Sequence, residues 1–342
     1  MEINHMIKHH FEQLKNHIES NKSFFEDHEL DPNQKWSLDL LAHGEYNLNF
    51  LFEQKELDKK LVIRMNLGSQ MNLKDQLSYE YKTLKLLEAS KRTAGAYRHY
   101  LLKDAKGEKL EFFTMQYLAG RSLDYKYDLP SLAELLADIH SLHVPQHHLI
   151  VPKDAAHSLF SECQSMLNAY KYSHHANASI LRQIERLQGK AQDALIALKE
   201  EAFQPCIINT ELNSGNFIIS DKGAYLIDWE KPLFADPAQD LGHALASTTS
   251  FWKTDHMLSI EEAQDCLGLY RQAVNKRIDL HNFEKRALAY ITLNCLRGVT
   301  WCAMAYCQYC DKSKSLLDED SFKKIKAYVD SEFIDWIIKN LP

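Results

Sequence analysis

The sequence has no excess of positive charge, since 40 Lys and Arg residues stand against 47 Asp and Glu, for a formal net charge of -7. This balance removes the usual electrostatic argument for binding nucleic acid or an anionic membrane surface, and it suits a cationic substrate better. Internal repeats and low-complexity tracts are also lacking, and 45% of the residues are apolar. With 342 residues, the chain is long enough for about two domains with cores of their own, which excludes disorder, collagen and a small disulfide scaffold.

No long apolar run is free of polar residues. The longest, Ala289 to Cys307, contains Asn294 and Arg297, and because a charged side chain is costly in lipid we interpret this run as a core helix without membrane insertion. Residues Met1 to Lys15 lack the continuous apolar core of a secretory signal, so we expect a cytoplasmic protein whose seven cysteines are thiols. The sequence does not indicate an oligomeric state.

Residues 1–117 have the pattern of a small α+β lobe. Apolar residues at intervals of three and four predict a leading helix over residues 1–21. Short runs rich in β-branched and aromatic residues predict an antiparallel five-stranded sheet with one main helix between the third and fourth strands. The strands are expected at Trp36–Ala42, Phe50–Glu53, Leu61–Met65, Ala96–Lys103 and Lys109–Gln116, and the helix at Leu73–Ser90.

Residues 118–342 predict a larger, mostly helical lobe, because three-and-four apolar spacing dominates after Tyr117. A β-rich segment interrupts the helices from Cys206 to Ile227. The helices are expected at Leu129–Leu142, Ala155–Tyr172 and Ala178–Glu201, and near Ala238, Ser259, Phe283 and Ser321.

Three polar residues in the β-rich segment carry the strongest chemical signal. Glu211 precedes Asn216 by five positions, and Asp228 ends the next apolar run twelve residues later. Phosphoryl transfer needs an Asn and an Asp to hold Mg²⁺ against the phosphates and a carboxylate to position the acceptor hydroxyl. These residues supply that set, so they predict a site for ATP and Mg²⁺.

The first lobe offers the other parts of such a site. Arg64 lies on the third expected strand, and Glu80, near the start of the following helix, is its natural partner. Gly44 and Asn47 lie in a turn between two strands, where a loop could cover phosphates. A backbone strand that could bind an adenine edge joins the lobes at Met115, Gln116 and Tyr117.

Together these residues resemble the aminoglycoside phosphotransferase and choline kinase superfamily, over about Trp36 to Leu245. That family reads His-Gly-Asp, four residues, Asn, then Ile-Asp-Trp or Ile-Asp-Phe, and a later Gly-Asp-Pro-x-x-Asp-Leu stretch. Here "FADPAQDLG" supplies Asp236 and Asp240 for the last motif, and "LAELLADIHSLH" is similar to the helix that leads into the catalytic half. The resemblance implies a two-lobed α+β fold related to protein kinases, with a nucleotide-binding lobe followed by a catalytic and substrate-binding lobe.

The resemblance also implies roles. Asn216 and Asp228 would bind Mg²⁺, Arg64 would hold the α- and β-phosphates, and Met115 to Tyr117 would form the adenine hinge. Arginine in place of lysine resembles the choline kinases and keeps a fixed charge with a two-pronged donor. Asp240 is expected to brace the catalytic loop through hydrogen bonds.

Two positions depart from the family pattern, since Asn209 replaces the motif His and Glu211 the catalytic Asp. Glutamate keeps the carboxylate but adds a methylene, and a shift of about 1 Å in a reacting group can cost on the order of a hundredfold in rate. The loop either sits further back to accommodate Glu211, or the protein is a nucleotide-binding pseudokinase with a regulatory or scaffolding role. Retention of both Asn216 and Asp228 favours an active enzyme.

The sequence therefore predicts an ATP-dependent phosphotransferase that acts on a hydroxyl of a small acceptor such as choline, ethanolamine, an aminoglycoside or a sugar. A protein-serine kinase is disfavoured because no Ala-Pro-Glu follows Asp228. Trp252, Trp301, Tyr306 and Tyr309 could surround a quaternary ammonium or pack in the helical core. Packing also explains the C-x4-C-x2-C cysteines from Cys302 to Cys310, and the three His-His doublets are expected to be solvated.

Overall fold

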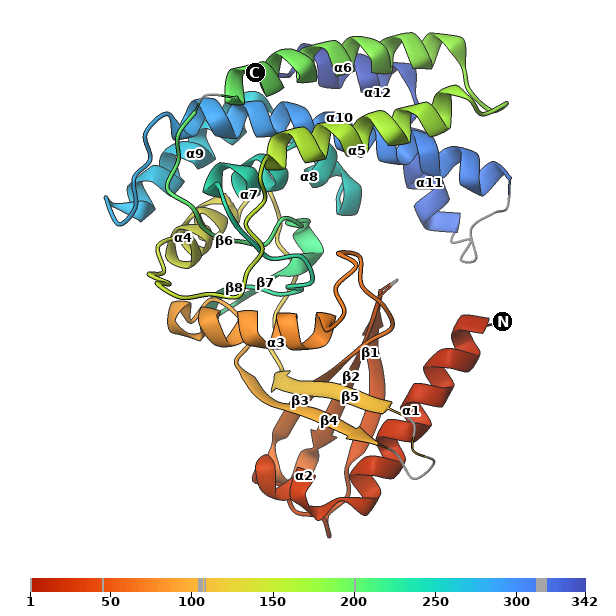
Figure 1. Ribbon diagram of the computed structural model, residues 1–342, viewed down its shortest axis with the longest axis vertical. Helices are drawn as coiled ribbons and strands as arrows, with labels where there is room; N and C mark the ends of the chain where they lie inside the picture. Colours follow the sequence, from red (N-terminus) through yellow and green to blue (C-terminus); the bar gives the residue numbers. More distant parts are fainter. Residues whose placement is uncertain (1, 45, 104–106, 108, 200, 312–318) are drawn as a thin grey trace. The chain divides into compact units, whose positions relative to one another are not determined.

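The computed structural model describes residues 2–44, 46–103, 107, 109–199, 201–311 and 319–342 (Figure 1). The chain divides into two units, and neither is a continuous stretch of sequence. The first contains Met1–Gly120, Pro145–His148 and Tyr225–Lys231. The second contains Arg121–Val144, Leu149–Ala224 and Pro232–Pro342. The α+β class predicted from the sequence is confirmed, with a five-stranded sheet in the first unit and mostly helices in the second.

The first unit is built on an antiparallel sheet with the strand order β1-β2-β3-β5-β4. Its strands are β1 (Ser37–His43), β2 (Asn47–Gln54), β3 (Lys59–Asn66), β4 (Ala96–Lys103) and β5 (Lys109–Gln116). All five predicted strands are present, and β4 and β5 have the predicted bounds. β2 begins earlier than predicted because Asn47 and Leu48 pair with Asn66 and Met65, so backbone pairing starts before the first residue of the predicted run, Phe50.

The two faces of this sheet carry different side chains, because successive residues of a strand point to opposite sides. One face packs against α1 (Glu2–Ser20) and α2 (Lys22–Asp27) in an apolar core. That core includes Leu14, Ile18, Phe24, Phe50, Phe52, Ile63 and Phe112. The other face presents Arg64, Phe113 and Met115 toward α3 (Gln76–Leu87). The sequence predicted α1 and α3 but not the short α2, which starts where the side chain of Asn21 accepts a hydrogen bond from the Ser23 amide.

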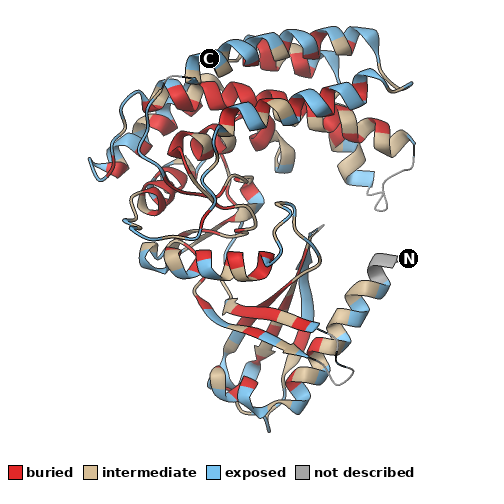
Figure 2. Cartoon of the chain, viewed as in Figure 1, coloured by how far each residue is buried: buried red, intermediate tan, exposed pale blue. Residues whose placement is uncertain are grey.

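The second unit is organised around α10 (Phe283–Cys310), a helix of 28 residues that is largely buried (Figure 2). Five helices pack against it, namely α5 (Ala155–Lys171), α6 (Ala178–Leu198), α7 (Pro237–Ala244), α8 (Ser247–Lys253) and α11 (Glu319–Tyr328). In addition, α4 (Leu129–His140) packs on α9 (Ile260–Val274), and α12 (Ser331–Lys339) packs on α6. The apolar run around Arg297 is thus a core helix, as predicted. Within the described residues, no helix is both long enough and apolar enough to cross a bilayer.

The β-rich segment forms two short antiparallel pairings. β6 (Cys206–Ile208) pairs with β9 (Leu233–Ala235), and β7 (Phe217–Ser220) pairs with β8 (Gly223–Leu226). The loop from β6 to β7 carries Glu211 and Asn216, and the loop after β8 carries Asp228. The residues with the predicted chemistry therefore lie on loops anchored at both ends by strands.

The close packing of α7 on α10 can be tested at Gly242, with Gly189 of α6 as the control. A Cβ built on Gly242 of α7 would lie 2.3 Å from Cβ of Tyr290 on α10, whereas one built on Gly189 of α6 meets no atom within 4 Å. We predict that Gly242→Ala lowers the free energy of unfolding by about 1–3 kcal/mol through overpacking. Gly189→Ala is expected to raise it by about 0.5–1 kcal/mol because alanine favours the helix. Denaturant unfolding measures both, and two changes of the same sign would contradict the packing described.

Candidate functional site

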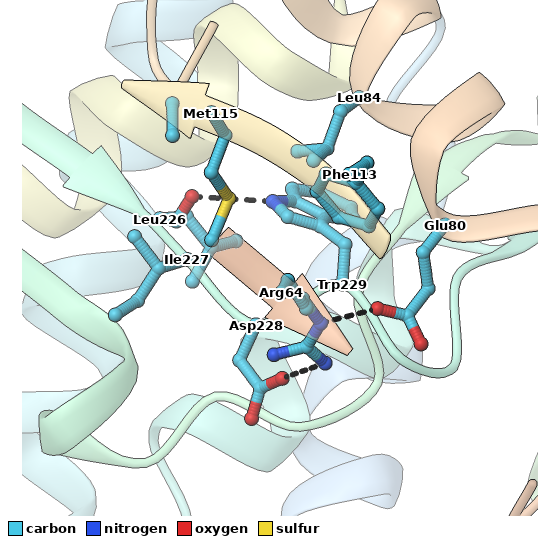
Figure 3. A pocket seen from close by; sticks show the side chains of 10 residues that line it. Arg64, Glu80, Leu84, Phe113, Met115, Leu226, Ile227, Asp228 and Trp229 are labelled. Atoms are coloured by element: carbon cyan, nitrogen blue, oxygen red, sulfur yellow. Dashed lines mark hydrogen bonds and ion pairs between the residues drawn. The ribbon is translucent and has the colours of Figure 1, made fainter. Parts of the chain in front are cut away.

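A buried arginine on the sheet lies among acidic side chains in the first unit. Nε of Arg64 on β3 donates to Oε2 of Glu80 on α3 at 2.6 Å. Nη2 of the same guanidinium donates to Oδ1 of Asp228 at 3.0 Å (Figure 3). It also donates to Oε1 of Glu230 at 2.9 Å. The Arg64 side chain is only 5% exposed, so these charge-assisted bonds act in a poorly hydrated environment.

The charge of Arg64 is held by its three carboxylate partners. Burial alone would lower the pKa of the guanidinium, but Glu80, Asp228 and Glu230 together raise this pKa above its usual value. Nε2 of Gln76 donates to Oε1 of Glu80 at 3.0 Å and to the backbone carbonyl of Glu230 at 2.7 Å. Sequence reasoning missed Glu230 and Gln76. The available signal for Glu230 was a second carboxylate two positions after Asp228.

A small pocket lies beside this cluster within the first unit. Its lining residues are Arg64, Glu80, Leu84, Ala94, Phe113, Met115, Leu226, Ile227, Asp228 and Trp229. Figure 3 shows the aliphatic side chains of Met115, Leu226 and Ile227 on one side and the charged groups of Arg64, Asp228 and Glu80 on another. The pocket therefore brings apolar side chains next to a fixed positive charge.

The turn between β1 and β2 is tied to Arg64 through asparagine side chains. The Gly44 amide donates to the Asn47 carbonyl at 3.0 Å, and Nδ2 of Asn49 donates to Oδ1 of Asn47 at 3.0 Å. Nη1 of Arg64 in turn donates to Oδ1 of Asn49 at 3.3 Å. These bonds connect Gly44 and Asn47 to the charged cluster, and their role toward phosphates stays a prediction.

The three residues predicted as an adenine hinge have different surroundings. The side chain of Met115 lines the pocket. The amide of Gln116 donates to the Gly95 carbonyl at 2.8 Å, and the ring of Tyr117 lies 5.6 Å from Nζ of Lys60. Only Met115 is therefore placed at the pocket, and adenine binding by the segment stays a prediction.

In the second unit, a buried aspartate braces the loop that follows β6. Asp240 of α7 accepts hydrogen bonds from the amides of Asn209 and Thr210, both at 2.8 Å. Its carboxylate also lies 3.3 Å from Nε2 of His140, and both side chains are fully buried. The bracing role predicted for Asp240 is confirmed.

Glu211 and Asn216 are joined directly on this loop. Nδ2 of Asn216 donates to the backbone carbonyl of Glu211 at 2.8 Å, which turns Oδ1 of the amide away from that contact. Nη2 of Arg297 on α10 lies 3.4 Å from Oε1 of Glu211, and Nε of Arg297 lies 3.6 Å from Oε2 of Glu162. The Glu211 carboxylate, 37% exposed, is thus reachable from solvent and fixed at one side by a cation.

Arg297 is a second functional candidate that sequence reasoning missed. Burial opposes its charge, but Glu162 and Glu211 raise the pKa of its guanidinium above the usual value. The available signal was a charged residue within the apolar run from Ala289 to Cys307, because buried charges are almost always paired. In the sequence, the charge of Arg297 argues against membrane insertion but does not reveal a partner.

Both loops contain a residue with a left-handed backbone. Thr210, directly before Glu211, has a φ of 73°, and Asp228 has a φ of 61°. This region is unfavourable for residues other than glycine, above all for β-branched ones, and such conformations concentrate at functional sites. The bond from the Thr210 amide to Asp240 helps to hold the first of them.

The predicted site residues are distributed over the two units. Arg64, Glu80 and Asp228 are together in the first unit, whereas Glu211 and Asn216 are together in the second. Joint binding of one Mg²⁺ by Asn216 and Asp228 therefore stays a prediction.

The aromatic residues of the helical region pack mainly on one another. The rings of Trp252 and Trp301 meet edge to face, with centroids 5.4 Å apart at 84°. Tyr309 and Tyr306 stack on Phe322, with centroids 5.1 and 6.1 Å away. All four rings are half-buried, and these contacts account for them by aromatic packing within the helical unit.

Comparison with known proteins identifies the family. The sequence pattern of the phosphotransferase enzyme family matches residues 37–273, more than half of the chain. The chain belongs to this family. No significant match was found among curated proteins.

Solved structures of phosphotransferases share the fold of this family member. A spectinomycin phosphotransferase in complex with ADP and spectinomycin has a TM-score of 0.60 at 14% identity, covering 88% of this chain and 91% of its own. A choline/ethanolamine kinase family protein from Mesorhizobium loti has a TM-score of 0.58 at 15% identity, covering 96% and 98%. A choline kinase from Cryptosporidium parvum has a TM-score of 0.61 at 10% identity, covering 90% of each chain. The resemblance to the aminoglycoside phosphotransferase and choline kinase superfamily is confirmed.

Proposed function

We propose that this phosphotransferase family member transfers the γ-phosphoryl group of ATP to a hydroxyl group of a small molecule, with Mg²⁺ as cofactor. The observation that carries the proposal is the Arg64 cluster, in which a buried arginine contacts both a helix glutamate and Asp228. Kinases use a cation, a helix carboxylate and a metal-binding aspartate in this way to hold nucleotide phosphates. ATP as the phosphoryl donor supports the cytoplasmic location expected from the sequence.

The pocket of the first unit is the proposed nucleotide site. The adenine ring lies against the apolar side around Met115, and the triphosphate extends toward Arg64 beneath the turn of Gly44 and Asn47. Because Nη2 of Arg64 is shared by Asp228 and Glu230, phosphate oxygens replace one of these carboxylates when nucleotide binds. The displaced carboxylate becomes free to bind a metal ion.

The oxygen donors of the two loops suit Mg²⁺, which prefers hard oxygen ligands. Asp228 offers a carboxylate that is 36% exposed, and Asn216 offers Oδ1 because its Nδ2 is engaged by the Glu211 carbonyl. Glu230, close to the same guanidinium as Asp228, is an additional candidate ligand. Bound Mg²⁺ would offset the negative charge of the β- and γ-phosphates.

Glu211 orients the acceptor hydroxyl and takes its proton. The hydroxyl oxygen forms a bond to the γ-phosphorus, the bond from that phosphorus to the bridging oxygen breaks, and ADP leaves. Arg297 holds the Glu211 carboxylate at its far end, so the longer glutamate side chain is anchored instead of mobile. This contact accounts for a glutamate where the family pattern has aspartate.

The acceptor is a small alcohol of the choline, ethanolamine, aminoglycoside or sugar type. The test is ADP release from ATP and Mg²⁺ in the presence of each candidate, together with the slower release caused by transfer to water. We predict that the protein releases ADP from ATP only when Mg²⁺ is present. The rate of release should rise when one class of acceptor is added. ATP binding without ADP release under any of these conditions would support the pseudokinase alternative, and absence of ATP binding would contradict both.

A further inference from the structure

A separate cluster of metal-ligating side chains lies in the second unit and includes none of the residues used by the proposed phosphoryl transfer. His174 and His175 occupy the turn between α5 and α6, and Asp311 caps the end of α10. Nε2 of His175 lies 2.8 Å from Oδ1 of Asp311, and Nε2 of His174 lies 3.6 Å from the same oxygen. Two segments 136 residues apart in sequence therefore converge on one carboxylate oxygen.

The cluster stands out from the rest of the described chain. One ligand atom from each residue lies within 4.8 Å of the other two, and no other group of three His, Cys, Asp or Glu residues outside the undescribed segments meets this condition. The sequence analysis treated this His-His doublet as solvated surface. The carboxylate that completes the cluster was not recognisable because it comes from the far end of another helix.

The spacing of these atoms suits a tetrahedral transition-metal ion. With bonds of about 2.0–2.1 Å, as for zinc and imidazole, neighbouring ligand atoms lie about 3.4 Å apart. The two distances to Asp311, 2.8 and 3.6 Å, fall on either side of this value, so small side-chain rotations admit an ion. The contact of His175 with Asp311 alone is that of an ordinary ion pair, but Nε2 of His174 approaches the same oxygen as well. The two rings, whose centroids lie 3.9 Å apart, would separate by side-chain rotation to bind one ion.

We propose that His174, His175 and Asp311 bind a divalent transition-metal ion such as Zn²⁺. Two imidazole nitrogens with one carboxylate oxygen suit Zn²⁺, Ni²⁺ or Cu²⁺, whereas Mg²⁺ and Ca²⁺ prefer oxygen ligands alone. The His174 and Asp311 side chains are 77% and 44% exposed, so the ion has an entry path and water can complete its coordination. Each imidazole would bind the ion through the lone pair of Nε2 while its ring proton is on Nδ1.

A bound ion would connect the α5–α6 turn to the end of α10. Because the unfolded chain does not hold these three residues together, binding stabilises the folded state. The site uses none of the residues assigned to ATP or Mg²⁺, so it stands or fails independently of the proposed kinase activity.

The test is calorimetric titration of the untagged, chelator-treated full chain with ZnCl₂, with Co²⁺ absorption as a readout of coordination geometry. We expect a Zn²⁺-binding event that His175→Ala and Asp311→Asn each weaken at least about tenfold, since even indirect partners of a metal ligand can contribute that much. Zn²⁺ should raise the thermal midpoint of the wild type more than that of either variant at the same concentration.

The matched control is the double variant His9→Ala/His10→Ala, which removes another His-His doublet and should leave the binding event unchanged. Circular dichroism without metal shows whether each variant folds. Zn²⁺ binding that survives both His175→Ala and Asp311→Asn, or a wild type that does not bind Zn²⁺, would overturn the proposal. Loss of binding in the variants with unchanged ATP turnover separates this site from the kinase centre.

Discussion

Replacing Asp228 by alanine is expected to reduce Mg²⁺-dependent ATP turnover by about 10²–10³-fold or more, the range for removing one group that stabilises transition-state charge. The variant loses a carboxylate proposed to hold Mg²⁺ against the phosphates. Its fold should persist because Arg64 keeps its contacts with Glu80 at 2.6 Å and Glu230 at 2.9 Å. Steady-state ADP release measures the loss of turnover, and thermal unfolding shows whether the fold persists.

Asp221→Ala is the matched control for this variant. Asp221 is an exposed carboxylate in the turn between β7 and β8, seven residues earlier in the chain. Its removal should leave both turnover and stability within error of the wild type. Full turnover in Asp228→Ala would remove the metal assignment.

The first unit shows how much of the fold could be predicted. Its five strands are predicted by short runs rich in β-branched and aromatic residues, and all five are present. The third run carries Arg64, and the helical spacing that follows carries Glu80, two residues that the structure places in contact. Local sequence patterns therefore sufficed where one sheet and one helix determine the neighbours.

Other parts of the site depend on packing between distant segments. Glu230 contacts Arg64 across 166 residues, and Arg297 contacts Glu211 across 86. Neither pairing leaves a local pattern, because the spacing along the chain does not fix which face of a long helix meets which loop. The short helices α2, α8 and α12 were also missed, since fewer than three turns carry too little periodicity.

Replacing Glu211 by glutamine is expected to lower kcat by about 10²–10⁴-fold, the usual contribution of a positioned general acid or base. The glutamine amide keeps the shape of the side chain but cannot take the proton of the substrate hydroxyl. Glu162→Gln is the matched control, because Glu162 contacts the same guanidinium through Nε, whereas Glu211 contacts it through Nη2. It should reduce kcat less than about tenfold, since it acts only on Arg297.

The length of the Glu211 side chain is part of the same prediction. Glu211→Asp withdraws the carboxylate from Nη2 of Arg297, which is already 3.4 Å away. We expect a loss on the order of a hundredfold, as for a reacting group displaced by about 1 Å. A gain of activity in Glu211→Asp would contradict the anchoring role of Arg297 and show that glutamate is too long for the reaction.

The proposed phosphoryl transfer depends most on its two metal ligands, Asn216 in the loop after β6 and Asp228 in the loop after β8. A crystal structure with Mg²⁺ and a non-hydrolysable ATP analogue tests them directly. We predict that Oδ1 of Asn216 and a carboxylate oxygen of Asp228 both lie about 2.0–2.1 Å from one Mg²⁺ that also contacts the phosphates. A nucleotide bound with its metal ion coordinated by neither residue would contradict the account.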